Sequence, residues 1–172
     1  MILYHGTYLE FKNIDLNKCA DYKDFGKGFY ATEIYDQAVA MAIRKARAFG
    51  GKPCVVSYEV SDNILKTENL RIKVFNKATT AWAKFVLNNR DREFIDFNDP
   101  LCNRDFKYDI VFGPVANDTL TTLIQQYKNK FISNSMLLAG MRYHSPSNQY
   151  SFHTEKAVKL LKKVDFKWIK NK

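Results

Sequence analysis

Two short segments near the start of the sequence combine glycines with histidine or tyrosine, a combination suited to binding an aromatic ligand. The first is His5-Gly6-Thr7, and the second runs from Gly26 to Tyr30. A glycine lets a ligand approach the backbone, whose N–H and C=O groups can pair with a planar amide. A neighbouring tyrosine ring can stack on an aromatic heterocycle. Together the segments predict a site that suits nicotinamide, although either one alone could be a turn beside a core tyrosine.

The pair of segments resembles the NAD⁺ signature of the ADP-ribosyltransferase superfamily, in its diphtheria-toxin and poly-ADP-ribose-polymerase branch. There a His-Gly-Ser/Thr motif ends the first strand, and a Gly-x-Gly-Ile/Phe-Tyr-x-Ala motif follows. The stretch Phe25-Gly26-Lys27-Gly28-Phe29-Tyr30 is very close to the polymerase form of the second motif. The stretches from Tyr108 to Ala116 and from Asn148 to Thr154 also look like a poorly characterised bacterial family assigned to that superfamily. The resemblance spans most of the chain.

The resemblance implies a role in NAD⁺ binding for each residue of the two motifs. His5 would hydrogen-bond a ribose hydroxyl, and the Gly6 backbone would pair with the nicotinamide carboxamide. Tyr30 would be the stacking platform. Thr7 would support the first motif through its hydroxyl, and Gly28 would let the chain pass close to the ligand. The alternative for His5 is a satisfied polar residue at a strand end.

A third motif departs from the usual pattern of these transferases, in which a glutamate polarises the ribose and stabilises an oxocarbenium-like transition state. Asn148-Gln149-Tyr150 looks like an Asn-Glu-Tyr motif with the acid replaced. The Gln149 amide can hydrogen-bond a ribose hydroxyl, but it brings no negative charge. Met41, eleven positions after Tyr30, stands where polymerases often place a second aromatic ring. Its thioether can still pack on nicotinamide.

Other polar residues give weaker candidates. Glu33, Asp118 and Glu155 could supply a displaced acid, but each stands at a predicted helix start, where an acidic side chain favours the helix dipole or caps the helix. His144 and His153 lack the spacing with cysteines or carboxylates that a metal site needs, so we expect no metal. Catalysis would then involve Gln149, His5 and Tyr30.

The composition favours one globular domain. A chain of 172 residues with 46% hydrophobic and 26% charged residues is sufficient for one compact core spanning residues 1–172. Three widely spaced cysteines indicate a reducing cytoplasm, and no apolar run is long enough to cross a bilayer. The formal net charge of +9 favours an anionic partner, which could be a dinucleotide, a nucleic acid or an acidic protein.

Hydrophobic periodicity predicts alternating strands and helices that do not form a regular βαβ series. We therefore expect an α+β domain with mainly antiparallel sheets, and the resemblance implies a split antiparallel core with flanking helices. Strands are expected at 2–6, 54–60, 70–74, 109–112, 149–153 and 164–168, with the strand at 54–60 half-buried. Helices are expected from an Asp36 cap to Gly50, from about Asn76 through Asn89, from an Asp118 cap, between Phe131 and Met141, and from near Thr154 with Ala157, Leu160 and Leu161 inward.

These features lead to three functional hypotheses. The first is an NAD⁺-dependent mono-ADP-ribosyltransferase that cleaves the nicotinamide–ribose bond, uses no metal, and transfers ADP-ribose to a protein or nucleic-acid acceptor. A bacterial toxin or effector role would suit it, with an antitoxin or other inhibitory protein as a possible partner. The second is a catalytically weak module that binds NAD⁺ or ADP-ribose. The third is a basic nucleic-acid-binding domain without cofactor.

Overall fold

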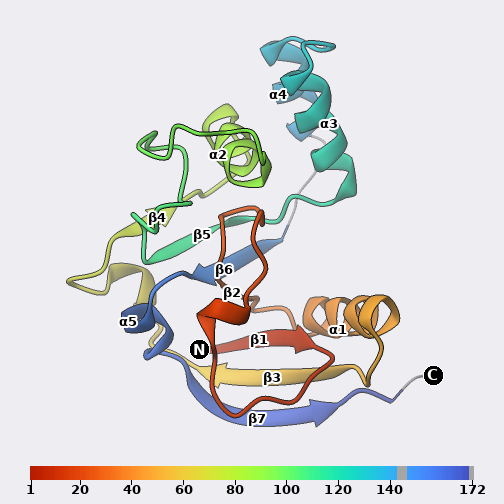
Figure 1. The fold of residues 1–172 in the computed structure, drawn as a ribbon, viewed down its shortest axis with the longest axis vertical. Coiled ribbons are helices and arrows are strands. Elements are labelled where there is room, and N and C mark those ends of the chain that lie inside the picture. The colour runs from red at the N-terminus through yellow and green to blue at the C-terminus, as the bar shows by residue number, and fades with distance from the viewer. Residues whose placement is uncertain (143–146, 171–172) are drawn as a thin grey trace.

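The computed structural model describes residues 1–142 and 147–170, and it confirms an α+β fold. Two β-sheets face one another, and helices cover their outer sides (Figure 1). The strands are β1 (Ile2–Thr7), β2 (Phe29–Ala31), β3 (Cys54–Glu59), β4 (Ile72–Val74), β5 (Ile110–Pro114), β6 (Asn148–Phe152) and β7 (Lys162–Trp168). The α-helices are α1 (Tyr35–Phe49), α2 (Thr80–Arg90), α3 (Asp118–Lys128), α4 (Asn134–Arg142) and α5 (Glu155–Val158).

The first sheet has the order β1-β3-β7 and is antiparallel throughout. Its middle strand, β3, was expected to be half-buried, and this expectation is wrong. Residues 54–58 are all buried, because α1 covers one face of the strand and the second sheet covers the other. Alternation of Val56 and Tyr58 with Ser57 therefore reflects two different buried faces rather than one buried and one solvated face.

The second sheet has the order β2-β6-β5-β4. Strands β2, β6 and β5 are antiparallel neighbours, whereas β4 runs parallel to β5. The sheet is therefore mixed, which departs from a purely antiparallel core. One of its faces packs toward the first sheet, and the opposite face carries Tyr30, Gln149 and Ser151, since side chains two residues apart share a face.

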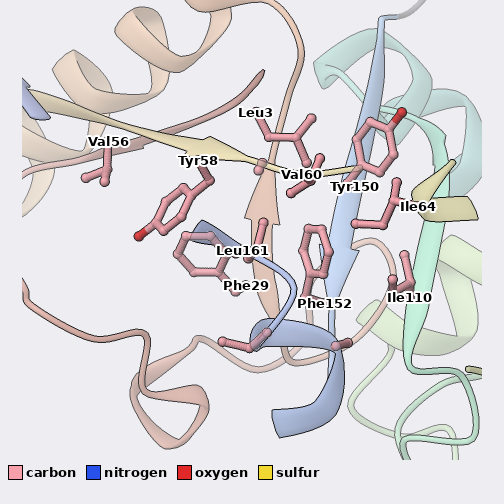
Figure 2. Packing of buried hydrophobic residues seen from close by; sticks show 13 residues of the cluster. Leu3, Phe29, Val56, Tyr58, Val60, Ile64, Ile110, Tyr150, Phe152 and Leu161 are labelled. Atoms are coloured by element: carbon pink, nitrogen blue, oxygen red, sulfur yellow. The ribbon is translucent and has the colours of Figure 1, made fainter. Parts of the chain in front are cut away.

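The main apolar core lies between the two sheets. Leu3, Val56 and Tyr58 come from the first sheet and meet Phe29 and Phe152 of the second, as Figure 2 shows. A second cluster lies on the opposite face of the second sheet, where Trp82 and Phe85 of α2 pack with residues of α3 and α4. The loop before β2 is fixed between elements, because Phe25 is fully buried in this second cluster.

Several helix starts and faces differ from the sequence-based expectation. Ile34, rather than Asp36, is the N-cap of α1, and Asp36 lies in the first turn, where its charge still favours the helix dipole. Asn117, rather than Asp118, caps α3 and accepts a hydrogen bond from the Leu120 amide. Helix α5 is only four residues long, so Leu160 lies beyond it and is 37% exposed instead of facing inward.

The two sheets are joined at one backbone bridge near the predicted site. The Tyr4 amide donates to the Thr32 carbonyl at 2.7 Å, and the Thr32 amide donates to the Tyr4 carbonyl at 3.0 Å. Apart from this bridge, β1 pairs within the first sheet and β2 pairs within the second. Beyond Tyr4, the edge of β1 that faces away from β3 is therefore not paired with β2.

Candidate functional site

Gly6 lies on the unpaired edge of β1, two residues after the bridge. In an antiparallel strand the amide and carbonyl of one residue point to the same side, and this side alternates along the chain. Both backbone groups of Tyr4 point toward Thr32, so those of Gly6 also point away from β3. The Gly6 backbone thus directs an N–H and a C=O to the edge of β1 that has no strand partner, here called the open edge, although Gly6 itself is buried under α1. A carboxamide pairs with such an N–H and C=O.

The absence of a side chain at Gly6 also has a structural cause. A Cβ atom at this position would lie 2.0 Å from the Ala38 carbonyl oxygen and 2.8 Å from the Ala42 nitrogen, both in α1. Helix α1 therefore crosses β1 in direct backbone contact, and any larger residue would push the helix off the sheet. Substitution of Gly6 tests folding before it tests binding.

Lys45 of α1 is a site residue that the sequence reading missed. Its Nζ donates to the Gly6 carbonyl at 2.8 Å. Burial, and then the nearby charge of Lys23, lower the pKa of Lys45 to about 8. Lys45 thus places a cation at the open edge, where it favours an anionic group. The sequence held one signal for this role. Lys45 follows Ala42 by three residues and Ala38 by seven, so it lies next to the buried face of α1.

His5 lies next to this edge and is fixed as a neutral ring. Its Nδ1 donates to the Tyr30 carbonyl at 2.6 Å, and its ring stacks on Phe29 with 4.3 Å between centroids. Burial, followed by the charge of Lys45, lowers the pKa of His5 to about 3. A neutral imidazole that donates through Nδ1 carries its lone pair on Nε2. Among the described residues His5 Nε2 has no hydrogen-bond partner, so its lone pair is available to a ligand.

Thr7 and Met41 flank these groups. The Thr7 hydroxyl accepts a long hydrogen bond of 3.4 Å from the Leu9 amide at the end of β1. Met41 is 41% exposed on α1. It stands one turn before Lys45, and residues four apart share a helix face. Met41 therefore lies on the same side of α1 as Lys45, which contacts Gly6.

The loop from Phe25 to Tyr30 is held by its own side chains. The Tyr30 hydroxyl donates to the Gly26 carbonyl at 2.7 Å and accepts from the Phe25 amide at 3.0 Å. Burial, and then the nearby Asp24 carboxylate, hold the pKa of Tyr30 well above its ordinary value. The Tyr30 ring is thus fixed in place on the sheet face that also carries Gln149.

Gly28 and Lys27 contact His153, which the sequence reading considered only as a metal ligand. His153 Nδ1 donates to the Lys27 carbonyl at 2.7 Å, and its Nε2 accepts from the Ser151 hydroxyl at 2.8 Å. A Cβ atom at Gly28 would lie 2.6 Å from His153 Nδ1. Gly28 is therefore required by the packing of β6 against the loop. The Lys27 ammonium lies 3.7 Å from Asp21.

Gln149 belongs to a polar network that the sequence did not reveal. Its Nε2 donates to Asp24 Oδ2 at 2.9 Å. Asp24 also pairs with Arg90 of α2, whose Nε and Nη2 contact Oδ1 at 2.9 and 2.5 Å. Asp24 is buried and stands directly before the Phe25–Tyr30 loop. The network therefore links the loop that begins after Asp24 to the Asn148-Gln149-Tyr150 motif. It also places the Asp24 carboxylate beside Gln149, the position where the related transferases have glutamate.

The three alternative acids are not gathered at this network. The Glu33 carboxylate accepts a hydrogen bond of 2.5 Å from the Tyr150 hydroxyl, which belongs to the sheet face opposite to Gln149. Asp118 and Glu155 are exposed in the first turns of α3 and α5. Their positions agree with the helix-dipole explanation.

Two surface hollows among the described residues lie away from Gly6 and Gln149, and the same residues contain no group of metal ligands. One hollow of about 570 Å³ lies on α1 around Ile43 and Arg47, and another of about 250 Å³ lies beside Tyr4 and Tyr35. Residues 1–142 and 147–170 contain no group of three His, Cys, Asp or Glu side chains that could hold a metal ion. His144 lies outside the described residues. No helix in this part of the chain is both long and apolar enough to cross a membrane.

The chain belongs to a protein family. A family model described as "Protein of unknown function (DUF3990)" matches residues 1–163, which is nearly the whole sequence. Neither the search of curated proteins nor the search of solved structures found a match. The family match covers all the candidate residues from His5 to Gln149, so these residues belong to the shared domain.

Proposed function

We propose that this protein is an NAD⁺-dependent mono-ADP-ribosyltransferase, with NAD⁺ as co-substrate and a protein or nucleic acid as acceptor. The observation that carries the proposal is the open edge of β1 at Gly6. Within a few residues it combines a backbone N–H and C=O outside the sheet pairing, the acceptor Nε2 of His5 and the cation of Lys45. These groups complement a carboxamide, a ribose hydroxyl and a pyrophosphate, which are the three parts of NAD⁺ nearest its reacting bond.

The proposed reaction breaks the bond between nicotinamide and ribose C1. The bonding electron pair leaves with nicotinamide, whose ring loses its positive charge, and ribose C1 becomes oxocarbenium-like. A nucleophile of the acceptor, or water, then attacks C1 and releases a proton. Backbone pairing at Gly6 would orient the leaving group, and an oxygen acceptor on a ribose hydroxyl would stabilise the cation through that hydroxyl.

Lys45 sets a condition for this binding mode. Its ammonium occupies one lone pair of the Gly6 carbonyl, and a carbonyl oxygen has two. A carboxamide N–H could use the second lone pair, while the remaining ammonium protons turn to a phosphate.

Three free cysteines, Cys19, Cys54 and Cys102, are consistent with a reducing compartment, and we extend the proposal to the cytoplasm.

The test combines binding, mapping and turnover. We expect ADP-ribose to bind in calorimetric titration and to shift the backbone amide resonances of Gly6 and Thr7. We expect nicotinamide to be released when NAD⁺ is added. His5→Phe keeps the stack on Phe29 but removes Nε2, together with the Nδ1 contact to the Tyr30 carbonyl, so ADP-ribose affinity should fall at least about 10-fold. The exposed α4 variant Met136→Ala should bind normally. Shifts confined to the outer face of α1 would contradict the assignment.

A second candidate function is favoured by the pairing of Asp24. Because Arg90 already neutralises this carboxylate and Gln149 is uncharged, the network offers no free negative charge to stabilise a cation. A module that binds ADP-ribose without splitting NAD⁺ would show the same resonance shifts but no nicotinamide release. Salt-sensitive RNA or DNA binding without ADP-ribose affinity would instead favour the nucleic-acid alternative.

A further inference from the structure

The side-chain amide of Gln149 has its orientation fixed by Asp24. Only the NH₂ end of a glutamine can donate to a carboxylate, so the contact of 2.9 Å with Asp24 Oδ2 assigns Nε2 to the inner position. The carbonyl oxygen Oε1 must then point the other way. Among the described residues Oε1 has no hydrogen-bond partner, and Gln149 is only partly buried.

Asp24 itself is held on every side. Two Arg90 nitrogens contact Oδ1, while the Ala116 amide donates to Oδ2 at 3.0 Å, beside the Gln149 contact. Arg90 is fixed in turn by the Thr121 hydroxyl at 2.8 Å. Four donors from three distant parts of the chain therefore saturate the carboxylate. The Asp24 carboxylate therefore has little freedom to rotate, and the Gln149 amide that donates to it is held in the same way.

We propose that Asp24 is a positioning residue that turns Gln149 into an acceptor, with Oε1 receiving a hydrogen bond from a ribose hydroxyl of the bound dinucleotide. This inference rests on the proposed function for the identity of the ligand, whereas the orientation rests on the protein contacts alone. Glutamine held in this way supplies a single oriented carbonyl dipole instead of a carboxylate. A free amide could present either end to the ligand, and the contact with Asp24 removes that choice.

The variant Asp24→Asn tests the orientation most directly. Arg90, with two nitrogens on Oδ1, keeps an oxygen there, so the new NH₂ group takes the place of Oδ2 and the Ala116 amide loses its acceptor. The NH₂ group then faces Gln149, whose amide must flip to present its oxygen inward. Nε2 would then face the ligand in place of Oε1. We expect nicotinamide release to fall about 10–100-fold, with a smaller change in KM, because the lost acceptor matters most in the transition state.

A double-mutant comparison separates positioning from an independent role. If Asp24 acts through Gln149, the double variant Asp24→Asn/Gln149→Ala should release nicotinamide as fast as Gln149→Ala alone. Multiplied losses would overturn the proposal, because Asp24 would then act independently. Met136→Ala, at an exposed position of α4 outside this network, serves as the control and should keep the wild-type activity.

A spectroscopic measurement on the wild-type protein decides the orientation without any variant having to fold. The Gln149 side-chain amide protons should exchange slowly with solvent, with one proton shifted downfield by the carboxylate. Protons that exchange like those of an exposed glutamine would overturn the proposal. If the protons are protected but ADP-ribose does not bind and nicotinamide is not released, the proposed function and the ribose contact both fail, and the orientation by Asp24 still holds.

Discussion

Replacing Gln149 by glutamate brings a second carboxylate next to Asp24, where Nε2 now lies 2.9 Å from Oδ2. Two unit charges about 3 Å apart repel by about 5 kcal/mol when the effective dielectric constant is about 20. Arg90, which contacts Asp24 Oδ1 at 2.5 Å, offsets part of this repulsion. We therefore expect Gln149→Glu to lower the free energy of unfolding by about 2–4 kcal/mol near neutral pH.

The pH dependence of this loss identifies its cause. Repulsion raises the pKa of the introduced glutamate carboxyl in the folded state above its ordinary value of about 4.3, so the folded state binds the proton more tightly than the unfolded state. The deficit relative to wild type should be small below the ordinary pKa and should grow as the pH rises through the folded-state pKa. Urea unfolding of both proteins between about pH 4 and pH 8 measures it. Gln149→Met, which removes one of the two donors to Asp24 Oδ2 without adding charge, should show a deficit of about 1–3 kcal/mol that does not follow this trend.

The same variant separates two views of the third motif. From the sequence alone, Gln149→Glu looks like the restoration of a missing acid. The Asp24 carboxylate at its inner end makes the variant a like-charge pair instead, so we expect no gain in nicotinamide release near neutral pH. A faster release together with unchanged stability would refute the placement of Gln149 beside Asp24.

Three other predictions concern the Gly6 edge and the loop after Asp24. Lys45→Met should weaken ADP-ribose binding about 10-fold and leave nicotinamide binding unchanged, because only ADP-ribose carries phosphates; equal effects on both ligands in calorimetry would contradict this role. Gly28→Ala should destabilise the protein by about 2–4 kcal/mol in urea unfolding because its Cβ would lie 2.6 Å from His153 Nδ1, whereas Gly50→Ala, with nothing within 4 Å, should cost only about 1–2 kcal/mol for its positive φ. Burial lowers the pKa of His5 to about 3 and that of His153 to about 4, so the unfolded state binds more protons and stability should fall as the pH drops below about 6.5, less steeply in His5→Asn than in wild type.

Hydrophobic periodicity predicted most helices and strands because it shows which face of an element is buried. It predicted the burial of β3 wrongly, because both faces of that strand are covered. The faces of α2 and α3 follow the spacing of Trp82, Phe85 and Leu120, which are all fully buried. Strand β3 has the same alternation as a half-exposed strand, but its second face is covered by α1, the helix directly before it, and the alternation within the strand does not show that packing. The predicted cap at Asp118 is one residue late because Asn117 is an equally good cap. The predicted cap at Asp36 is two residues late because α1 begins after Ile34, which makes no side-chain cap hydrogen bond and carries no capping signal.

The candidate site was predictable only where its residues are close in sequence. The glycine motifs pointed to the edge of β1 and to the loop before β2, which the structure joins through the His5–Tyr30 contact. Asp24 and Gln149 are 125 residues apart, and no spacing rule relates them. Asp24 reads as an ordinary loop acid, and its role depends on Arg90, 66 residues away. Sequence periodicity carries no information on such pairs.

His5 and Gln149 share a feature that bears on which ligand the site accepts. Each has its donor satisfied inside the protein, by the Tyr30 carbonyl and by Asp24 respectively, and each presents only an acceptor outward. A peptide amide or a base edge offers mixed donors and acceptors, whereas a ribose hydroxyl can donate to either group. With Lys45 supplying positive charge nearby, fixed acceptors next to a cation favour a hydroxyl-bearing sugar joined to a phosphate. Because the protein sets the polarity of both acceptors before a ligand arrives, little reorganisation is needed on binding, and this preorganisation favours a sugar phosphate over a peptide amide or a base edge.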